Sequence, residues 1–344
     1  MQVISRRKQH YQVNSDLRSY LKQYDREADL PILYKGLTQP YESSPLIDKD
    51  GEDTLWRTYI YEPTIFPEIN AALTRIYALL KAAGNERVME HLRVDRVDFC
   101  SFGNSQPFRV RIVNQYNDNY DYFYVKRADA SRIYGLELEE LLSPSSINYL
   151  VHEDTLIEEH IVGIPGDQFI REHFERPTLN RVRVAKEFIK FNERCFVRLL
   201  GDMRAYNYVV GITPDFENEQ YRVRPIDFDQ QCYEGKHKIY LPQFFKDNLP
   251  VVQLVTGLLN FETMQQYQNE ERALMARRAN TIPYRLANLR VCMGEDTIST
   301  PEKTEQLKQE LAEFHNYKGF LDCQTMGELV FRHVDYLLFE QGNG

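Results

Sequence analysis

The chain has 344 residues, 42% of them apolar, and its 51 acidic and 42 basic residues give a formal charge of −9. This length supports a large packed core, and the acidic balance argues against a protein that coats nucleic acid through a general positive field. There is no apolar run of about 18 residues and no secretory signal at the N-terminus, so we expect a cytoplasmic protein without a membrane span.

The five cysteines are widely spaced, and none of them forms a C-x-x-C pair. An odd number of scattered cysteines without a histidine cluster is typical of reduced thiols in a cytosolic protein. The sequence therefore predicts neither disulfides nor a zinc site.

The first ninety residues are predicted to be helices joined by loops. Residues 15–30 place apolar side chains at helical spacing after Asn14 or Ser15, either of which suits a helix N-cap. The polar stretch 38–53 is predicted to be a surface loop. Residues 67–84 predict an amphipathic helix that begins with Pro67 and ends near Gly84.

After this helix the hydrophobic pattern changes to alternation, which indicates strands. Five strands are predicted, at 94–104, 108–116, 121–129, 147–153 and 155–163. Helices are predicted at 128–142, 181–200 and 300–314, and a hairpin at 206–212 and 221–228. This order predicts an α+β protein with two lobes, in which a five-stranded antiparallel sheet precedes a helical part.

The segment 199–231 contains the residues that are most suggestive of chemistry. Asp202 lies five residues before Asn207, and Asp227 ends the second strand of the predicted hairpin. The hairpin would bring these three side chains to one end, where their oxygens suit Mg²⁺ held by few protein ligands and by phosphates. The alternative is that they are ordinary turn and strand-end residues.

This segment resembles the catalytic core of the protein-kinase-like superfamily. It is most similar to the branch of aminoglycoside and choline phosphotransferases, in which a G-D-x-x-x-x-N loop is followed by I-D-F. The resemblance implies a bilobal fold, with an N-terminal helical extension (1–92), an N-lobe (93–163) and a helical C-lobe (164–344). It also implies ATP- and Mg²⁺-dependent phosphotransfer, with Asp202 as the catalytic residue for the acceptor hydroxyl and Asn207 and Asp227 as metal ligands.

The same resemblance implies a partner for the nucleotide phosphates upstream. Lys126 ends the third predicted strand, where such kinases carry the lysine that binds the α- and β-phosphates. Its carboxylate partner would come from the helix 128–142. Glu140 shares the face of the helix directed at the sheet, Glu137 is a nearly equal candidate, and Glu139 is also available.

The remaining nucleotide contacts are implied by position alone. Residues 155–163 resemble a hinge strand, so the backbone groups of Glu159, His160 and Ile161 would face adenine. The turn 101–107 contains only Gly103, which would contribute to a phosphate lid that is not rich in glycine.

Three departures from the family pattern leave the activity open. Leu200 stands where a histidine usually precedes Gly-Asp, Asp229 replaces the glycine of D-F-G, and no A-P-E follows. The rival interpretations are a pseudokinase that binds nucleotide or acts as a scaffold, and a kinase-fold enzyme that transfers AMP. The acceptor is expected to be a small molecule or a protein, with neither nucleic acid nor a membrane as partner.

Two further features have alternative interpretations. Tyr120, Tyr122 and Tyr124 alternate on one strand face, where we expect them to pack beneath the N-terminal helices rather than stack nucleic-acid bases. Five arginines between Arg272 and Arg290 are predicted to form a solvated helical face. The alternative for them is a site for an acidic or phosphorylated substrate.

Overall fold

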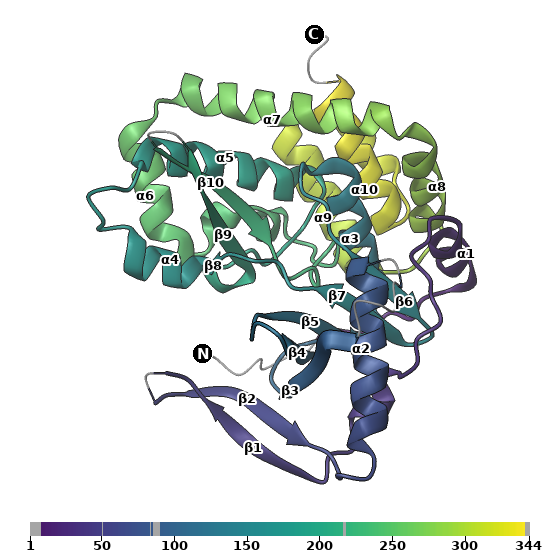
Figure 1. The fold of residues 1–344 in the computed structure, drawn as a ribbon. Helices are drawn as coiled ribbons and strands as arrows, with labels where there is room; N and C mark the ends of the chain where they lie inside the picture. The colour runs from purple at the N-terminus through teal and green to yellow at the C-terminus, as the bar shows by residue number, and fades with distance from the viewer. Residues whose placement is uncertain (1–7, 50, 83, 85–89, 216–217, 341–344) are drawn as a thin grey trace. The chain divides into compact units, whose positions relative to one another are not determined.

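The computed structural model describes residues 8–49, 51–82, 84, 90–215 and 218–340 (Figure 1). The chain mixes helices and strands and divides into two compact units. The first unit comprises Met1–Ala130 and Ile147–His160, and the second comprises Ser131–Ser146 and Ile161–Gly344. This division differs from the three segments expected from the sequence, because residues 1–92 belong to the first unit and not to a separate extension.

Among its described residues, the first unit is built on a seven-stranded antiparallel sheet in the order β1-β2-β3-β4-β5-β7-β6. The strands are β1 (Glu42–Ile47), β2 (Asp53–Ile60), β3 (Leu92–Cys100), β4 (Phe108–Asn114), β5 (Tyr120–Arg127), β6 (Tyr149–His152) and β7 (Thr155–Glu159). The expected meander is present as β3, β4 and β5. Two strands more than the predicted five are found, both of them before residue 92.

The prediction of a surface loop at 38–53 is therefore wrong, and so is a purely helical N-terminal segment. β1 pairs with β2, and β2 pairs with β3. β1 is an edge strand that contains Pro45 and a register irregularity after it. An edge strand tolerates proline and polar side chains because its outer backbone groups face solvent, so its sequence lacks clear alternation.

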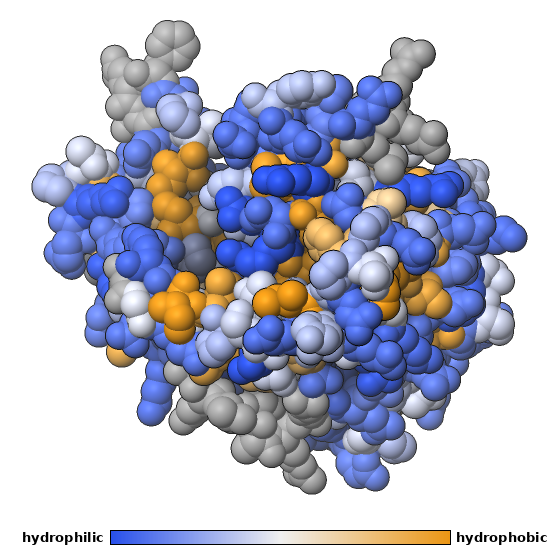
Figure 2. All heavy atoms as spheres, turned by 60° about the horizontal axis from the view of Figure 1, so that its bottom comes forward, coloured by the Kyte–Doolittle hydropathy of each residue, from blue (hydrophilic) through white to orange (hydrophobic). Residues whose placement is uncertain are grey.

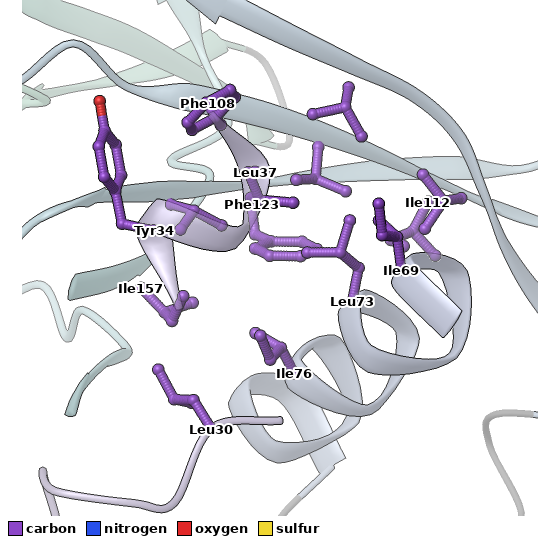
Figure 3. Packing of buried hydrophobic residues seen from close by; sticks show 14 of the residues in the cluster. Leu30, Tyr34, Leu37, Ile69, Leu73, Ile76, Phe108, Ile112, Phe123 and Ile157 are labelled. Carbon is purple, nitrogen blue, oxygen red and sulfur yellow. The ribbon is translucent and has the colours of Figure 1, made fainter. Parts of the chain in front are cut away.

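In its described part, the first unit has the helices α1 (Ser15–Gln23) and α2 (Phe66–Ala82) and the short 3-10 helix η1 (Tyr34–Leu37). Side chains of η1 and α2 pack in a core on one face of the sheet. Asn14 is the N-cap of α1, because its side chain accepts the backbone N–H groups of Asp16 and Leu17. Figure 3 shows Leu73 of α2 packed toward the sheet residue Phe123, in a core of buried hydrophobic residues that also includes Tyr34.

The second unit is mainly helical. Its α-helices are α3 (Ala130–Leu142), α4 (Gly166–His173), α5 (Arg181–Val197), α6 (Leu249–Leu258), α7 (Phe261–Thr281), α8 (Pro283–Gly294), α9 (Pro301–His315) and α10 (Met326–Asp335). Its shorter helical turns are η3 (Ala205–Asn207), η4 (His237–Tyr240), η5 (Pro242–Phe244), η6 (Lys246–Asn248), η7 (Lys318–Asp322) and η8 (Tyr336–Glu340). A small sheet in the order β10-β9-β8 contains β8 (Ile164–Pro165), β9 (Tyr208–Asp215) and β10 (Asn218–Pro225). The buried helix α5 packs against α6, α7 and β10 and so supports this hairpin.

Helix α3 belongs to the second unit from its second residue onward, and not to the N-lobe that the sequence predicted. The helix is almost entirely buried, and two of its contacts are ion pairs: Glu137 pairs with Arg285 at 2.8 Å, and Glu139 pairs with the fully buried Arg198. Charged groups at such buried positions need partners, and the partners lie in the second unit.

All five cysteines are buried free thiols, in agreement with the expectation that no disulfide forms. None of the helices in the described ranges is both long and apolar enough to cross a membrane. On the face seen in Figure 2, hydrophilic side chains predominate and hydrophobic ones form smaller separate groups.

Candidate functional site

The loop between α5 and β9 carries Asp202 and is fixed by backbone hydrogen bonds. The N–H of Gly201 donates to the Gln230 carbonyl at 3.1 Å, and the N–H of Asp202 donates to the Ile239 carbonyl at 3.1 Å. Asp202 adopts a φ of +57°, a left-handed conformation that aspartate tolerates better than most residues. The loop therefore holds Asp202 in an unusual but well-supported backbone conformation.

Asn207 connects this loop to the β9–β10 hairpin. Its Nδ2 donates to the Asp202 carbonyl at 2.7 Å, and its own carbonyl accepts the N–H of Ile226 at 3.0 Å. The last hairpin pair is Tyr208 with Pro225, so Asp227 follows directly at the same end. The structure thus brings Asp202, Asn207 and Asp227 together at one end of the hairpin, while their chemical roles stay predictions.

Burial and charged neighbours determine the pKa of Asp202. Burial raises the pKa of Asp202 to about 6, and Asp227 adds to this increase, whereas the nearby Arg204 opposes it. The Nε of Arg204 lies 3.1 Å from Asp202 Oδ1, and its guanidinium lies over the ring of Phe245 at 5.1 Å. Asp202 is therefore mainly ionised at pH 7 and able to accept a proton. Sequence reasoning missed Arg204, although an arginine two residues after the key aspartate was a visible signal.

Arg132 of α3 is the second residue that the sequence did not predict. Its side chain is 1% exposed, and its Nη1 lies 2.8 Å from Asp227 Oδ1 and 2.7 Å from Asp229 Oδ1. The N–H of Asp229 also donates to Asp227 Oδ1 at 2.9 Å. Asp229 thus forms a buried ion pair with Arg132.

The oxygen atoms of Asn207 and Asp227 suit Mg²⁺ in kind. Because Nδ2 of Asn207 donates to a carbonyl, its amide oxygen is directed elsewhere and remains the potential ligand atom. In the described part of the chain, no group of three or more His, Cys, Asp or Glu side chains could hold a metal. Asp227 Oδ1, the expected ligand atom, is also the atom that lies 2.8 Å from Arg132 Nη1.

In the first unit, Lys126 of β5 is a buried cation with a buried partner. Its Nζ lies 2.7 Å from Glu158 Oε2, and the two side chains are 7% and 4% exposed. Glu158 was not among the candidate partners, which were all sought on α3. The sequence signal that could have identified Glu158 as a candidate partner of Lys126 is its position directly before Glu159 in the predicted hinge strand.

The three α3 glutamates belong to the other unit. Glu137 and Glu139 form the arginine pairs described above, and the Glu140 carbonyl accepts a hydrogen bond from Arg278 at 2.8 Å. The pairing of Lys126 with Glu140 stays a prediction.

The expected hinge residues differ from one another in their contacts. The Glu159 side chain pairs with Lys81 at 3.0 Å, and its N–H donates to the Asn148 carbonyl at 3.0 Å, so this N–H is already used. Burial lowers the pKa of His160, whose Nδ1 lies 3.2 Å from the Tyr124 hydroxyl. Ile161 is buried and begins the return to the second unit. Contacts of these residues with adenine stay predictions.

Gly103 lies in the turn between β3 and β4. Its carbonyl accepts the N–H of Gln106 at 3.3 Å, which closes the turn. The described structure gives this glycine a local structural contact, and its role toward phosphate stays a prediction.

The alternating tyrosines do not lie beneath the N-terminal helices, so that expectation is wrong. Side chains alternate along β5, and the helices cover the face of Phe123. Tyr120 and Tyr122 lie on the opposite face. The guanidinium carbon of Arg111 lies 4.1 Å from the centre of the Tyr120 ring, and that of Arg109 lies 5.3 Å from the centre of the Tyr122 ring. These arginines form ion pairs with Asp95 and Asp98. Both arginines over the tyrosine rings are therefore paired with carboxylates.

The arginine-rich segment of α7 and α8 is a solvated face only in part: Arg277 is exposed, whereas other arginines form ion pairs. Arg272 pairs with the buried Glu193 at 2.6 Å, and Arg285 pairs with Glu137. Arg290 pairs with Asp335 at 2.6 Å. These pairs join helices within the second unit, and a site for an acidic substrate in this segment stays a prediction.

A cavity of about 660 Å³ in the first unit is separate from Lys126. Its lining includes Arg18, Lys35, Arg127 and Glu153. Arg127 follows Lys126 on β5 and so points to the other face of the sheet.

No protein-family model and no curated protein match the chain. Among solved structures, a titin kinase with its flanking domains is similar to it, with a TM-score of 0.27 and 12% sequence identity. The match covers 74% of this chain and 48% of that chain, so this chain spans about half of that structure's length. A similarity this weak does not establish a shared fold.

Proposed function

We propose that the chain is a kinase-like phosphotransferase that transfers the γ-phosphate of ATP to a hydroxyl of a small molecule or a protein. The observation that carries the proposal is the convergence of Asp202, Asn207 and Asp227 at one end of the β9–β10 hairpin. The hydrogen bond from Asn207 Nδ2 to the Asp202 carbonyl, at 2.7 Å, fixes two of these residues to each other.

Each residue has a role that follows from its chemistry. Asp202 accepts the proton of the acceptor hydroxyl, and its raised pKa keeps it a usable base near neutral pH. Arg204 places a cation 3.1 Å from Asp202, where it stabilises negative charge on the transferred phosphoryl group. Lys126 binds the nucleotide phosphates. Mg²⁺, held by Asn207 and Asp227, supplies neutralisation of the phosphate charge.

The direct test is the variant Asp202→Ala. We expect it to abolish transfer while ATP binding stays nearly intact, because Asp202 contacts the acceptor and not the nucleotide. Asp215→Ala is the matched control, since Asp215 lies at the opposite end of β9 and its side chain is 41% exposed. Transfer is followed with labelled ATP against metabolites and protein extracts. Unchanged transfer by the Asp202 variant would refute the assignment.

A pseudokinase is the second candidate, and the contact of Arg132 with Asp227 favours it. A buried guanidinium 2.8 Å from the expected metal ligand opposes cation binding there. This candidate predicts a thermal shift with ATP that does not depend on Mg²⁺, and no transfer to any acceptor. In the same experiments, intact-mass measurement separates an added phosphate from an added AMP.

A further inference from the structure

The face of β5 that carries Lys126 also carries a large aromatic side chain. Tyr124 and Lys126 are two residues apart on one strand, so they share a face. Tyr124 stands opposite Glu158 in the register of β5 and β7, and Glu158 binds Lys126. Lys126 Nζ lies 5.3 Å from the centre of the Tyr124 ring. The ring is therefore next to the lysine that we expect to bind phosphates.

The other end of the same ring reaches the expected hinge. The Tyr124 hydroxyl lies 3.2 Å from His160 Nδ1, and the two ring centres are 5.9 Å apart. Burial raises the pKa of Tyr124 to about 12, so the hydroxyl is neutral at physiological pH and can donate to the imidazole. A cation–π contact at one end and a hydrogen bond at the other thus hold the ring in place.

A nucleotide that uses both Lys126 and the hinge must place its base between them. Lys126 would bind the phosphates, and the backbone at His160 would contact the base. The ring of Tyr124 contacts both residues and so lies between them. A purine and a phenol ring cannot share this space, because protein interiors are close-packed.

We infer that Tyr124 occupies the position of the nucleotide base and must turn away before ATP binds in the first unit. This inference rests on the proposed function. If the inference holds, Tyr124 sets the nucleotide affinity. ATP would bind only to the conformation in which the ring has turned away, and the apparent affinity would fall in proportion to the small population of that conformation.

The test compares the binding of Mg²⁺–ATP to the full chain and its variants by isothermal titration calorimetry. Tyr124→Ala is expected to bind about tenfold more tightly, because it loses both the hydrogen bond and the cation–π contact that favour the closed ring. Tyr124→Phe keeps the ring and loses only the hydrogen bond, so a smaller gain of a few-fold is expected. Tyr120→Ala, on the same strand face and 56% exposed at the tyrosine, is the control that should leave affinity unchanged.

Three results would overturn the inference. Equal affinity of wild type and Tyr124→Ala would show that the ring is no obstacle, and the proposed function would stand. Weaker binding by Tyr124→Ala would show that the ring stacks on the base instead of replacing it. If none of the proteins binds ATP, the proposed function fails together with the inference. Should Tyr124→Ala not fold, His160→Ala removes the same hydrogen bond from the other side and should tighten binding a few-fold.

Discussion

Replacing Arg132 by methionine is expected to lower the free energy of unfolding of the second unit by about 3 kcal/mol. The Arg132 side chain is 1% exposed, and it contacts Asp229, 8% exposed, and Asp227, 33% exposed. Removing one partner of a fully buried ion pair costs roughly 3–5 kcal/mol, because the remaining charge stays desolvated. The partial exposure of Asp227 places the expected loss at the lower end of that range.

Urea unfolding followed by circular dichroism measures this loss. The single tryptophan, Trp56, lies in the first unit, so its fluorescence gives a separate signal for that unit. The double variant Arg132→Met, Asp229→Asn should recover part of the loss, because it removes the buried charge as well. Arg222→Met is the matched control: Arg222 is an exposed arginine of the same unit, and a change below about 0.5 kcal/mol is expected.

Magnesium gives this experiment a second readout. Without Arg132, the carboxylates of Asp227 and Asp229 lose the cation that competes for them, so Mg²⁺ should raise the melting temperature more in the variant than in the wild type. A loss below about 1 kcal/mol would refute the reasoning about the ion pairs. Equal effects of Mg²⁺ on both proteins would refute the competition at Asp227.

Two further predictions concern the stability of the second unit. Gly327→Ala should cost about 2–4 kcal/mol, because its Cβ would collide with the Met293 carbonyl, whereas Gly257→Ala, with open space around it, should be neutral or stabilising by up to about 1 kcal/mol. Thermal unfolding of both variants tests this, and equal melting temperatures would contradict it. Burial lowers the pKa of His315 from 6.5 to about 4, so the unfolded chain binds the extra proton between these values and stability should fall as the pH falls from about 6.5 to 4. Urea midpoints at pH 7 and pH 5 should differ more in the wild type than in His315→Gln, and an equal difference would refute the role of His315.

Local patterns predicted much of the fold. The meander β3 to β5, the helix α2 and the hairpin β9–β10 all have clear hydrophobic periods and turn residues between them. β1 was not predicted, because its sequence, ESSPLI, has the polar and proline-containing character of an edge strand. The assignment of α3 to the second unit was also not predicted, because it involves ion pairs such as Glu137 with Arg285, whose members lie far apart in the sequence.

The candidate site was also predicted only in part. The convergence of Asp202, Asn207 and Asp227 follows from one short hairpin, so spacing alone was enough to predict it. Arg132 and Glu158 were not predicted, because a buried cation or carboxylate has no sequence pattern of its own. Their positions become clear only when the partners Asp227 and Lys126 are placed in space.

The assignment of α3 to the second unit has a consequence for dissecting the protein. The chain passes between the units three times, after residues 130, 146 and 160. A fragment that starts at residue 161 would lack α3, and it would leave the buried Arg198 without Glu139 and remove the helix that packs at Gly135 against Phe228. The shortest fragment expected to fold as the second unit therefore begins at Ser131. It must carry β6 and β7 of the first unit as an insertion in which the two strands pair with each other but β7 lacks its partner β5, so the two units are not separable by a single cut.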